Sequence, residues 1–207
     1  VGEVMALGRT FPEALLKAVQ SLEIGVDALD GGGPDKPAPS ENLTAGGKDA
    51  INQALDHLAV PLPDRLFAVY RVLRSNIFPE TVALKTGMDF WFLAQMAQVA
   101  QVERDLSVLE NPDTEAGAAL IAHAKRMGFA DSHLARLIPA TGSAKKAWTS
   151  LDIRALRKKW NVLPVFHQVD TCAAEFEAQT PYLYSTYELE SEAPPTDRPK
   201  VLILGGG

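Results

Sequence analysis

The stretch that decides the fold is "DFWFLAQMAQVAQVERDLSVLE", residues 89–110. Asp89 suits the position before a helix, because a short carboxylate accepts hydrogen bonds from the first free backbone N–H groups. Apolar residues then recur every three or four positions, which is the spacing of one face of an α-helix. They are Phe92, Met96, Val99, Val102 and Leu106. We therefore predict a long amphipathic helix that begins after Asp89 and buries this face.

Shorter helical patterns lie on both sides of this segment. Thr10 and Glu13 form a capping box, and the apolar residues that follow predict a helix ending near Gly25. Similar spacing predicts further helices at about 48–59, 66–73, 79–86 before Gly87, from Pro112 or Asp113 to about 127, 131–138, and 150–160. The predicted fold class is mainly α, a helical bundle-like domain with short extended segments at both ends.

The flanks of the helical region have a different composition. Residues 31–47, "GGGPDKPAPSENLTAGG", are rich in Gly, Pro and Ser and predict a linker. From about residue 161 the pattern indicates extended chain, with one apolar strand at 201–204 before three glycines. A single strand leaves its backbone groups unsatisfied, and the chain starts at Val1 without a methionine. We expect both ends to continue in a longer polypeptide.

The overall composition narrows the class of protein. The chain has 207 residues, 46% of them hydrophobic, and a net charge of −6, which is typical of a soluble globular protein without a nucleic-acid partner. One cysteine excludes an internal disulfide and fits the reducing cytoplasm. No apolar run reaches the roughly 20 residues of a membrane-spanning helix.

Isolated reactive residues give weak signals. Cys172 has no adjacent base, while Glu175 and Glu177 place negative charge beside it, which disfavours a thiolate. We interpret Cys172 as a packing residue, with a cysteine-dependent enzyme as the alternative. The four histidines lack zinc-ligand spacing and are interpreted as scattered surface or core residues. They are His57, His123, His133 and His167.

Two features leave alternatives open. Nine basic residues within 121–160 suggest a DNA-binding helical module, although a charged, solvated face explains them as well. They are Lys125, Arg126, Arg136, Lys145, Lys146, Arg154, Arg157, Lys158 and Lys159. Trp91 and Phe92, beside Phe90, predict core packing, or the anchors of an oligomer contact if they are exposed.

Several longer stretches carry a family resemblance. "VGEVMALGRTFPEALLKAVQSLEIG" resembles the end of the first ATP-grasp half in the large subunit of carbamoyl-phosphate synthetase. "MDFWFLAQM", "KRMGFADSHLARL" and "IRALRKKWNVLPVFHQVDT" are similar to its helical oligomerisation domain. "VDTCAAEFEAQTPYLYSTYE" resembles its connector between the halves, and "DRPKVLILGGG" the first strand of the second half. The resemblance implies this division: 1–30, first half; 31–47, linker; 48–165, oligomerisation domain; 166–198, connector; 199–207, second half.

The resemblance also implies a function. The parent family makes carbamoyl phosphate from bicarbonate, ATP and glutamine-derived ammonia, for arginine and pyrimidine synthesis. It uses magnesium (or manganese) and potassium, a glutaminase small subunit, and contacts between large subunits. The resemblance assigns no catalytic, cofactor or metal residue to this chain, which we expect to be inactive alone.

Three groups of residues are candidates for structural roles. By analogy, Glu3, Val4 and Met5 lie near the interior of the first half. Trp91 and Phe92 are the candidates for an oligomer contact if they are exposed. The interdomain connector is represented by Cys172, Glu175, Phe176, Tyr182, Tyr184 and Tyr187. Such a connector fills irregular gaps with aromatic rings and satisfies their hydroxyl tips.

Overall fold

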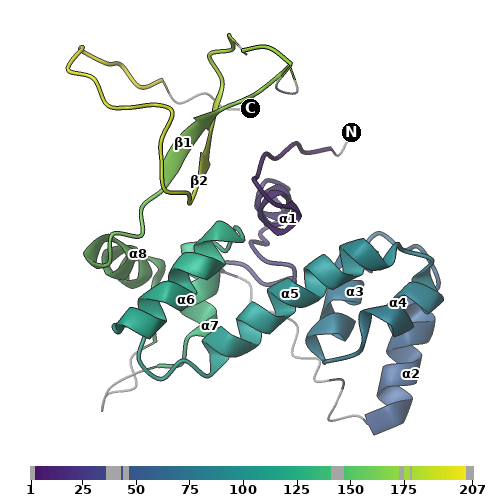
Figure 1. Cartoon of the computed structure of the whole chain (residues 1–207). Coiled ribbons are helices and arrows are strands. Elements are labelled where there is room, and N and C mark those ends of the chain that lie inside the picture. Colours follow the sequence, from purple (N-terminus) through teal and green to yellow (C-terminus); the bar gives the residue numbers. More distant parts are fainter. Residues whose placement is uncertain are drawn as a thin grey trace. The chain divides into compact units, whose positions relative to one another are not determined.

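The computed structural model describes residues 3–35, 43, 47–140, 147–172, 175–177 and 179–203. These residues form eight helices and two short strands, so the predicted mainly α class is confirmed (Figure 1). The helices are α1 (Phe11–Gln20), α2 (Gly47–Leu58), α3 (Arg65–Arg74), α4 (Pro79–Thr86), α5 (Phe90–Ser107), α6 (Glu115–Arg126), α7 (Asp131–Leu137) and α8 (Ser150–Lys159). The strands are β1 (Val165–Gln168) and β2 (Leu183–Thr186).

Helix α5 lies at the centre of the first compact unit, residues 1–163. It contacts α3 and α4 along one part of its length and α6 and α7 along another, and it also contacts α1 (Figure 1). Its buried side consists of Leu93, Met96, Val99, Ala100, Val102, Glu103 and Leu106. The predicted apolar face is therefore confirmed except at Phe92, which is 43% exposed.

Local hydrogen bonds set the helix ends. The Asp89 carboxylate accepts a hydrogen bond from the Trp91 N–H at 2.7 Å and caps α5 as predicted. The prediction that Gly25 ends the first helix is wrong. Helix α1 ends at Gln20, where the Ser21 hydroxyl and N–H both donate to the Lys17 carbonyl. The helix does not continue, because Glu23 adopts a left-handed backbone with a φ of 55°.

The start of α6 is also later than predicted. The side chain of Asn111 accepts a hydrogen bond from the Asp113 N–H at 3.0 Å, which turns the chain outside the helix. The Thr114 hydroxyl then accepts from the Gly117 N–H at 3.1 Å and acts as the N-cap. Helix α6 therefore begins at Glu115 rather than at Pro112 or Asp113.

A tight, buried loop follows α1. Residues 26–33 are all buried, including the three glycines that open the expected linker. The Asp27 N–H donates to the Gly32 carbonyl at 2.9 Å, and the Gly32 N–H donates to the Asp30 carboxylate at 2.8 Å. The first part of the expected linker is thus packed chain, while residues 36–42 and 44–46 lie outside the described residues.

The second unit, residues 164–207, contains β1 and β2. The strands pair antiparallel, with Val165 opposite Thr186 and Gln168 opposite Leu183. The sequence did not predict this pairing. It predicted a strand at 201–204, as the first strand of a following synthetase half. Residues 201–203 are at least 84% exposed and pair with no described strand of this chain, so that strand stays a prediction. Residue 204 and the terminal glycines lie outside the described part of the chain.

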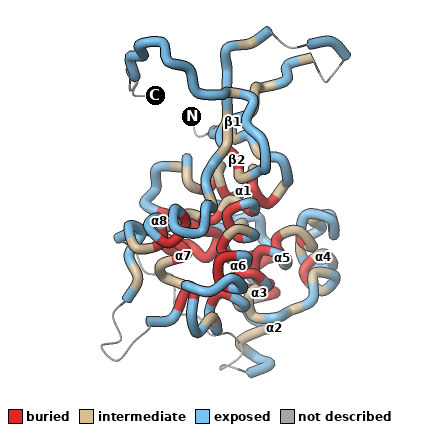
Figure 2. The backbone as a smooth tube through the Cα atoms, turned by 60° about the vertical axis from the view of Figure 1, so that its left-hand side comes forward, coloured by how far each residue is buried: buried red, intermediate tan, exposed pale blue. Residues whose placement is uncertain are grey.

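Burial differs between the two units. Figure 2 shows the buried residues concentrated where α3, α5, α6 and α7 pass, whereas the tube around β1 and β2 is mostly exposed or intermediate. The first unit thus carries the hydrophobic core, to which α1, α2 and α8 also contribute.

Replacing Gly33 by alanine should destabilise the first unit. An added Cβ would lie 1.9 Å from the Gly25 carbonyl oxygen, so backbone on both sides of the buried loop must shift. We expect a loss of about 1–3 kcal/mol in the free energy of unfolding, measured by urea denaturation.

Gly47→Ala is the matched control, because the new Cβ meets nothing within 4 Å and only the positive φ of 69° opposes it. A cost no greater at Gly33 than at Gly47 would show that the loop packs less tightly than described.

Candidate functional site

Three aromatic rings from two helices form a cluster at the start of α5, here called the aromatic cluster. Phe11 of α1 lies 5.3 Å from Trp91 and 5.2 Å from Phe92, measured between ring centroids. Trp91 and Phe92 are 5.1 Å apart, and all three pairs meet edge to face. This geometry is the one that the quadrupoles of aromatic rings favour.

The aromatic cluster is held in place but not covered. Trp91 is 51% exposed and Phe92 43% exposed, and the neighbouring Phe90 is 49% exposed. The prediction that these side chains belong to the core is therefore wrong, because the buried side of α5 begins only at Leu93. Large aromatic side chains grouped at a surface are typical of interaction sites.

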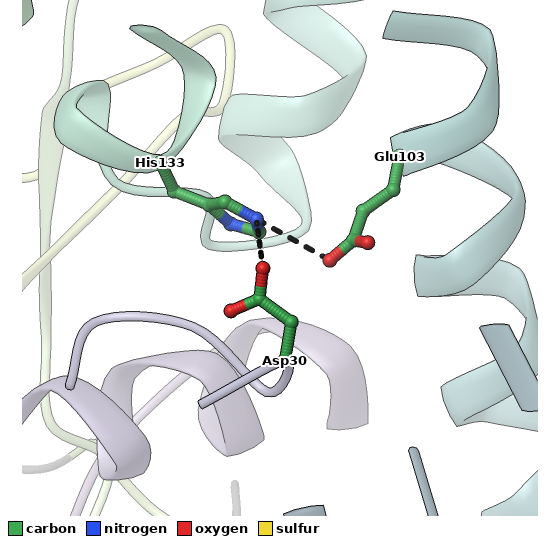
Figure 3. A group of neighbouring side chains, drawn as sticks. All are labelled: Asp30, Glu103 and His133. Atoms are coloured by element: carbon green, nitrogen blue, oxygen red, sulfur yellow. Dashed lines mark ion pairs between the residues drawn. The ribbon is translucent and has the colours of Figure 1, made fainter. Parts of the chain in front are cut away.

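A second group of side chains lies inside the first unit. His133 of α7, Glu103 of α5 and Asp30 of the buried loop point toward one another (Figure 3). The His133 Nε2 atom lies 3.3 Å from a Glu103 oxygen and 4.0 Å from an Asp30 oxygen. The Phe129 ring stacks on the imidazole with 5.0 Å between centroids. Sequence reasoning missed this group because its members come from three distant segments.

Helix α3 adds two polar side chains to this group. Arg74 Nε lies 2.7 Å from the second Glu103 oxygen. Burial alone would raise the pKa of Glu103, but His133, Arg74 and Tyr70 hold it below its ordinary value of 4.5. Burial and the Glu103 charge raise the pKa of Tyr70 well above 10.0, so its hydroxyl stays neutral.

Two further carboxylates pair with three of the nine basic residues in 121–160. Asp131 binds Arg157 through two contacts of 2.8 and 2.6 Å and also Lys125 at 3.0 Å. Asp27 binds Arg136 through contacts of 3.1 and 2.6 Å.

An exposed pair adds to these contacts, with Lys159 bound to Asp113 at 2.7 Å. Lys145 and Lys146 lie outside the described residues. Four of the basic residues are thus engaged with carboxylates, and nothing here favours the DNA-binding alternative.

The connector residues are spread over the second unit. Cys172 is half-buried, and its backbone N–H donates to the Asp170 carboxylate at 2.9 Å. Its sulfur lies 3.7 Å from the Thr171 hydroxyl, which is not a base that could activate a thiol. Glu175, Phe176 and Tyr182 are exposed.

Two connector tyrosines are half-buried, Tyr184 and Tyr187, and the Tyr184 ring lies 6.0 Å from that of His167. At the other end of the chain, Glu3, Val4 and Met5 are exposed. Their packing against neighbouring domains stays a prediction. Among the described helices, none combines the length and the apolar content that crossing a membrane requires.

Asp131→Asn should destabilise the first unit, because it removes the carboxylate that two largely buried cations share. We expect a loss of roughly 2–3 kcal/mol in the free energy of unfolding at neutral pH, measured by urea denaturation. Asp113→Asn removes a similar ion pair at the exposed surface and should change little. Equal effects of the two substitutions would contradict the role given to Asp131.

Stability should fall in acid. The pKa values of Asp27, Glu103 and Asp131 are all lowered, against burial that alone would raise them, by their basic and hydrogen-bonding partners. At a pH near the ordinary carboxyl pKa values of 3.8 and 4.5, the folded chain therefore binds fewer protons than the unfolded chain. The stabilisation from these carboxylates is present at higher pH and is lost as the pH falls below these values. Thermal unfolding between pH 7 and pH 3 measures this, and a flat profile would contradict it.

Comparison with known proteins places these features in a family. Residues 3–161 match the model of the family described as "Carbamoyl-phosphate synthetase large chain, oligomerisation domain". The carbamoyl phosphate synthase large chains of Myxococcus xanthus and of a Nostoc species are each 42% identical over all 207 residues, and that of Thermus thermophilus is 41% identical. The chain spans 17–18% of the length of these relatives. It belongs to the family of carbamoyl-phosphate synthetase large-chain oligomerisation domains.

Proposed function

We propose that the first unit joins large chains of a carbamoyl-phosphate synthetase to one another, and that the aromatic cluster is part of the contact. The observation that carries this proposal is the position of Trp91 and Phe92, which are half-exposed and braced by Phe11 in a family described by oligomerisation. Because the rings are already ordered by one another, little side-chain entropy is lost when a partner covers them.

The polar network supports a scaffold role. Glu103 and His133 connect α5 to α7, and Arg74 connects α3 to α5. The Glu103 carboxylate is buried, so moving Arg74 away from it would leave a buried charge uncompensated. A surface carried by such a frame keeps its shape before a partner arrives.

The activity of the whole protein is part of the same proposal. Its relatives are large chains of carbamoyl phosphate synthase, and the chain would serve as a non-catalytic part of this ligase. The full protein would use bicarbonate, ATP and ammonia from a glutaminase small subunit, with magnesium (or manganese) and potassium, in the cytoplasm. The connector of the second unit would then pack against a synthetase half through Phe176, Tyr182 and Tyr187.

Trp91→Ala should weaken self-association. Trp91 contributes a large apolar surface, and loss of an aromatic anchor at an interface commonly costs about 2 kcal/mol or more, or roughly a 30-fold rise in the dissociation constant. Sedimentation velocity over a concentration series of the chain measures this.

Leu151→Ala is the control, because Leu151 is 71% exposed on α8, away from the aromatic cluster in sequence. A monomeric wild-type chain at all concentrations would contradict the assembly role. Unchanged association of Trp91→Ala would contradict the role of the aromatic cluster alone.

A further inference from the structure

The group of Asp30, Glu103 and His133 has the arrangement of a metal site. Each residue offers one ligand atom, and the three atoms lie within 4.8 Å of one another. The two measured separations from His133 Nε2, 3.3 and 4.0 Å, compare with roughly 3.3 Å between two ligands of a tetrahedral zinc ion. Figure 3 shows both carboxylates directed at the same ring nitrogen.

The hydrogen bonding of the group is incomplete. His133 and Glu103 are each 1% exposed, and neither imidazole nitrogen makes a well-aligned hydrogen bond to another described residue. Buried polar atoms are nearly always satisfied, so this group requires an explanation. A cation between the His133 nitrogen and one oxygen each of Glu103 and Asp30 would give the imidazole a partner and draw the three segments together.

The charges of the group are compatible with a bound cation. Glu103 is paired with the Arg74 guanidinium, whereas Asp30 faces the His133 imidazole and accepts a hydrogen bond from the Gly32 N–H. The neighbouring carboxylates Asp27 and Asp131 already have cations of their own. Two carboxylates gathered in one buried group attract a cation, because an uncompensated charge inside a protein is costly.

We infer that Asp30, Glu103 and His133 bind one divalent transition-metal ion, which ties the buried loop to α5 and α7. A mixed set of imidazole and carboxylate ligands favours zinc over the oxygen-preferring magnesium and calcium. Arg74 holds the second Glu103 oxygen and so orients the first one, as the outer partners of metal ligands do. The role of the ion is structural, because the site is buried and binding is coupled to folding.

The test uses the whole chain, stripped of metal with a chelator and then titrated with zinc. Calorimetry and metal analysis should give one zinc ion per chain. The Tm should rise by roughly 5–10 °C at a free zinc concentration of 100 times Kd. His133→Asn and Asp30→Asn should lose this uptake and this rise. His123→Asn, which removes an exposed histidine from α6, should keep both.

If a variant does not fold, the wild-type chain still tests the inference. The imidazole NMR signals of His133 should shift on addition of zinc, while those of His123 stay in place. No uptake, an unchanged Tm, or binding that survives in His133→Asn would overturn the inference.

Discussion

The burial of one side of α5 is the constraint on which the rest of the first unit depends. Leu93, Val99 and Leu106 are completely buried along this side, and five other helices contact the same element. The buried loop of residues 26–33 adds Ala28 and Leu29 to the same core. Because so many elements share one helix, displacement of α5 would disturb all of them together.

The first turn of α5 carries exposed aromatic side chains rather than core residues. The cap at Asp89 fixes the first turn, and the turn then places Trp91 and Phe92 outside the core, against Phe11. The same helix therefore stabilises the unit through its later turns and presents aromatic rings through its first. Beyond the first turn, Glu103 brings charge into the interior, where its partners come from α3 and α7.

Much of the fold could be predicted from the sequence, because helix caps and apolar spacing are local signals. Asp89 caps as expected, and Met96 and Val102 lie in the core. Thr10 also caps its helix, but the predicted capping box is incomplete, because the Glu13 carboxylate accepts from the Arg9 N–H instead. The antiparallel strands were missed because their pairing joins residues 15 to 21 positions apart, too far for the signal of a tight hairpin turn. Phe92 was wrongly assigned to the core. Helical spacing shows which apolar residues share one face of a helix, but it does not show how far along the helix that face is covered.

The candidate sites were also only partly predictable, because the sequence shows which residues are neighbours along the chain but not which meet in space. The aromatic residues were visible as a group because they are adjacent in sequence, although only the structure gave their exposure. His133 was dismissed because its neighbours in sequence include no zinc-ligand pattern, and its partners in space, Asp30 and Glu103, are 103 and 30 positions away. Asp131 gave no signal either, since its partners are on α6 and α8.

Hydrogen exchange measured residue by residue, at low and at high chain concentration, tests the central claim most directly. The account predicts that amides from Leu93 to Leu106 exchange slowest at both concentrations. Those around Trp91 and Phe11 should slow markedly only at the higher concentration. Rapid exchange in the middle of α5, or concentration-dependent protection confined to other helices, would contradict it.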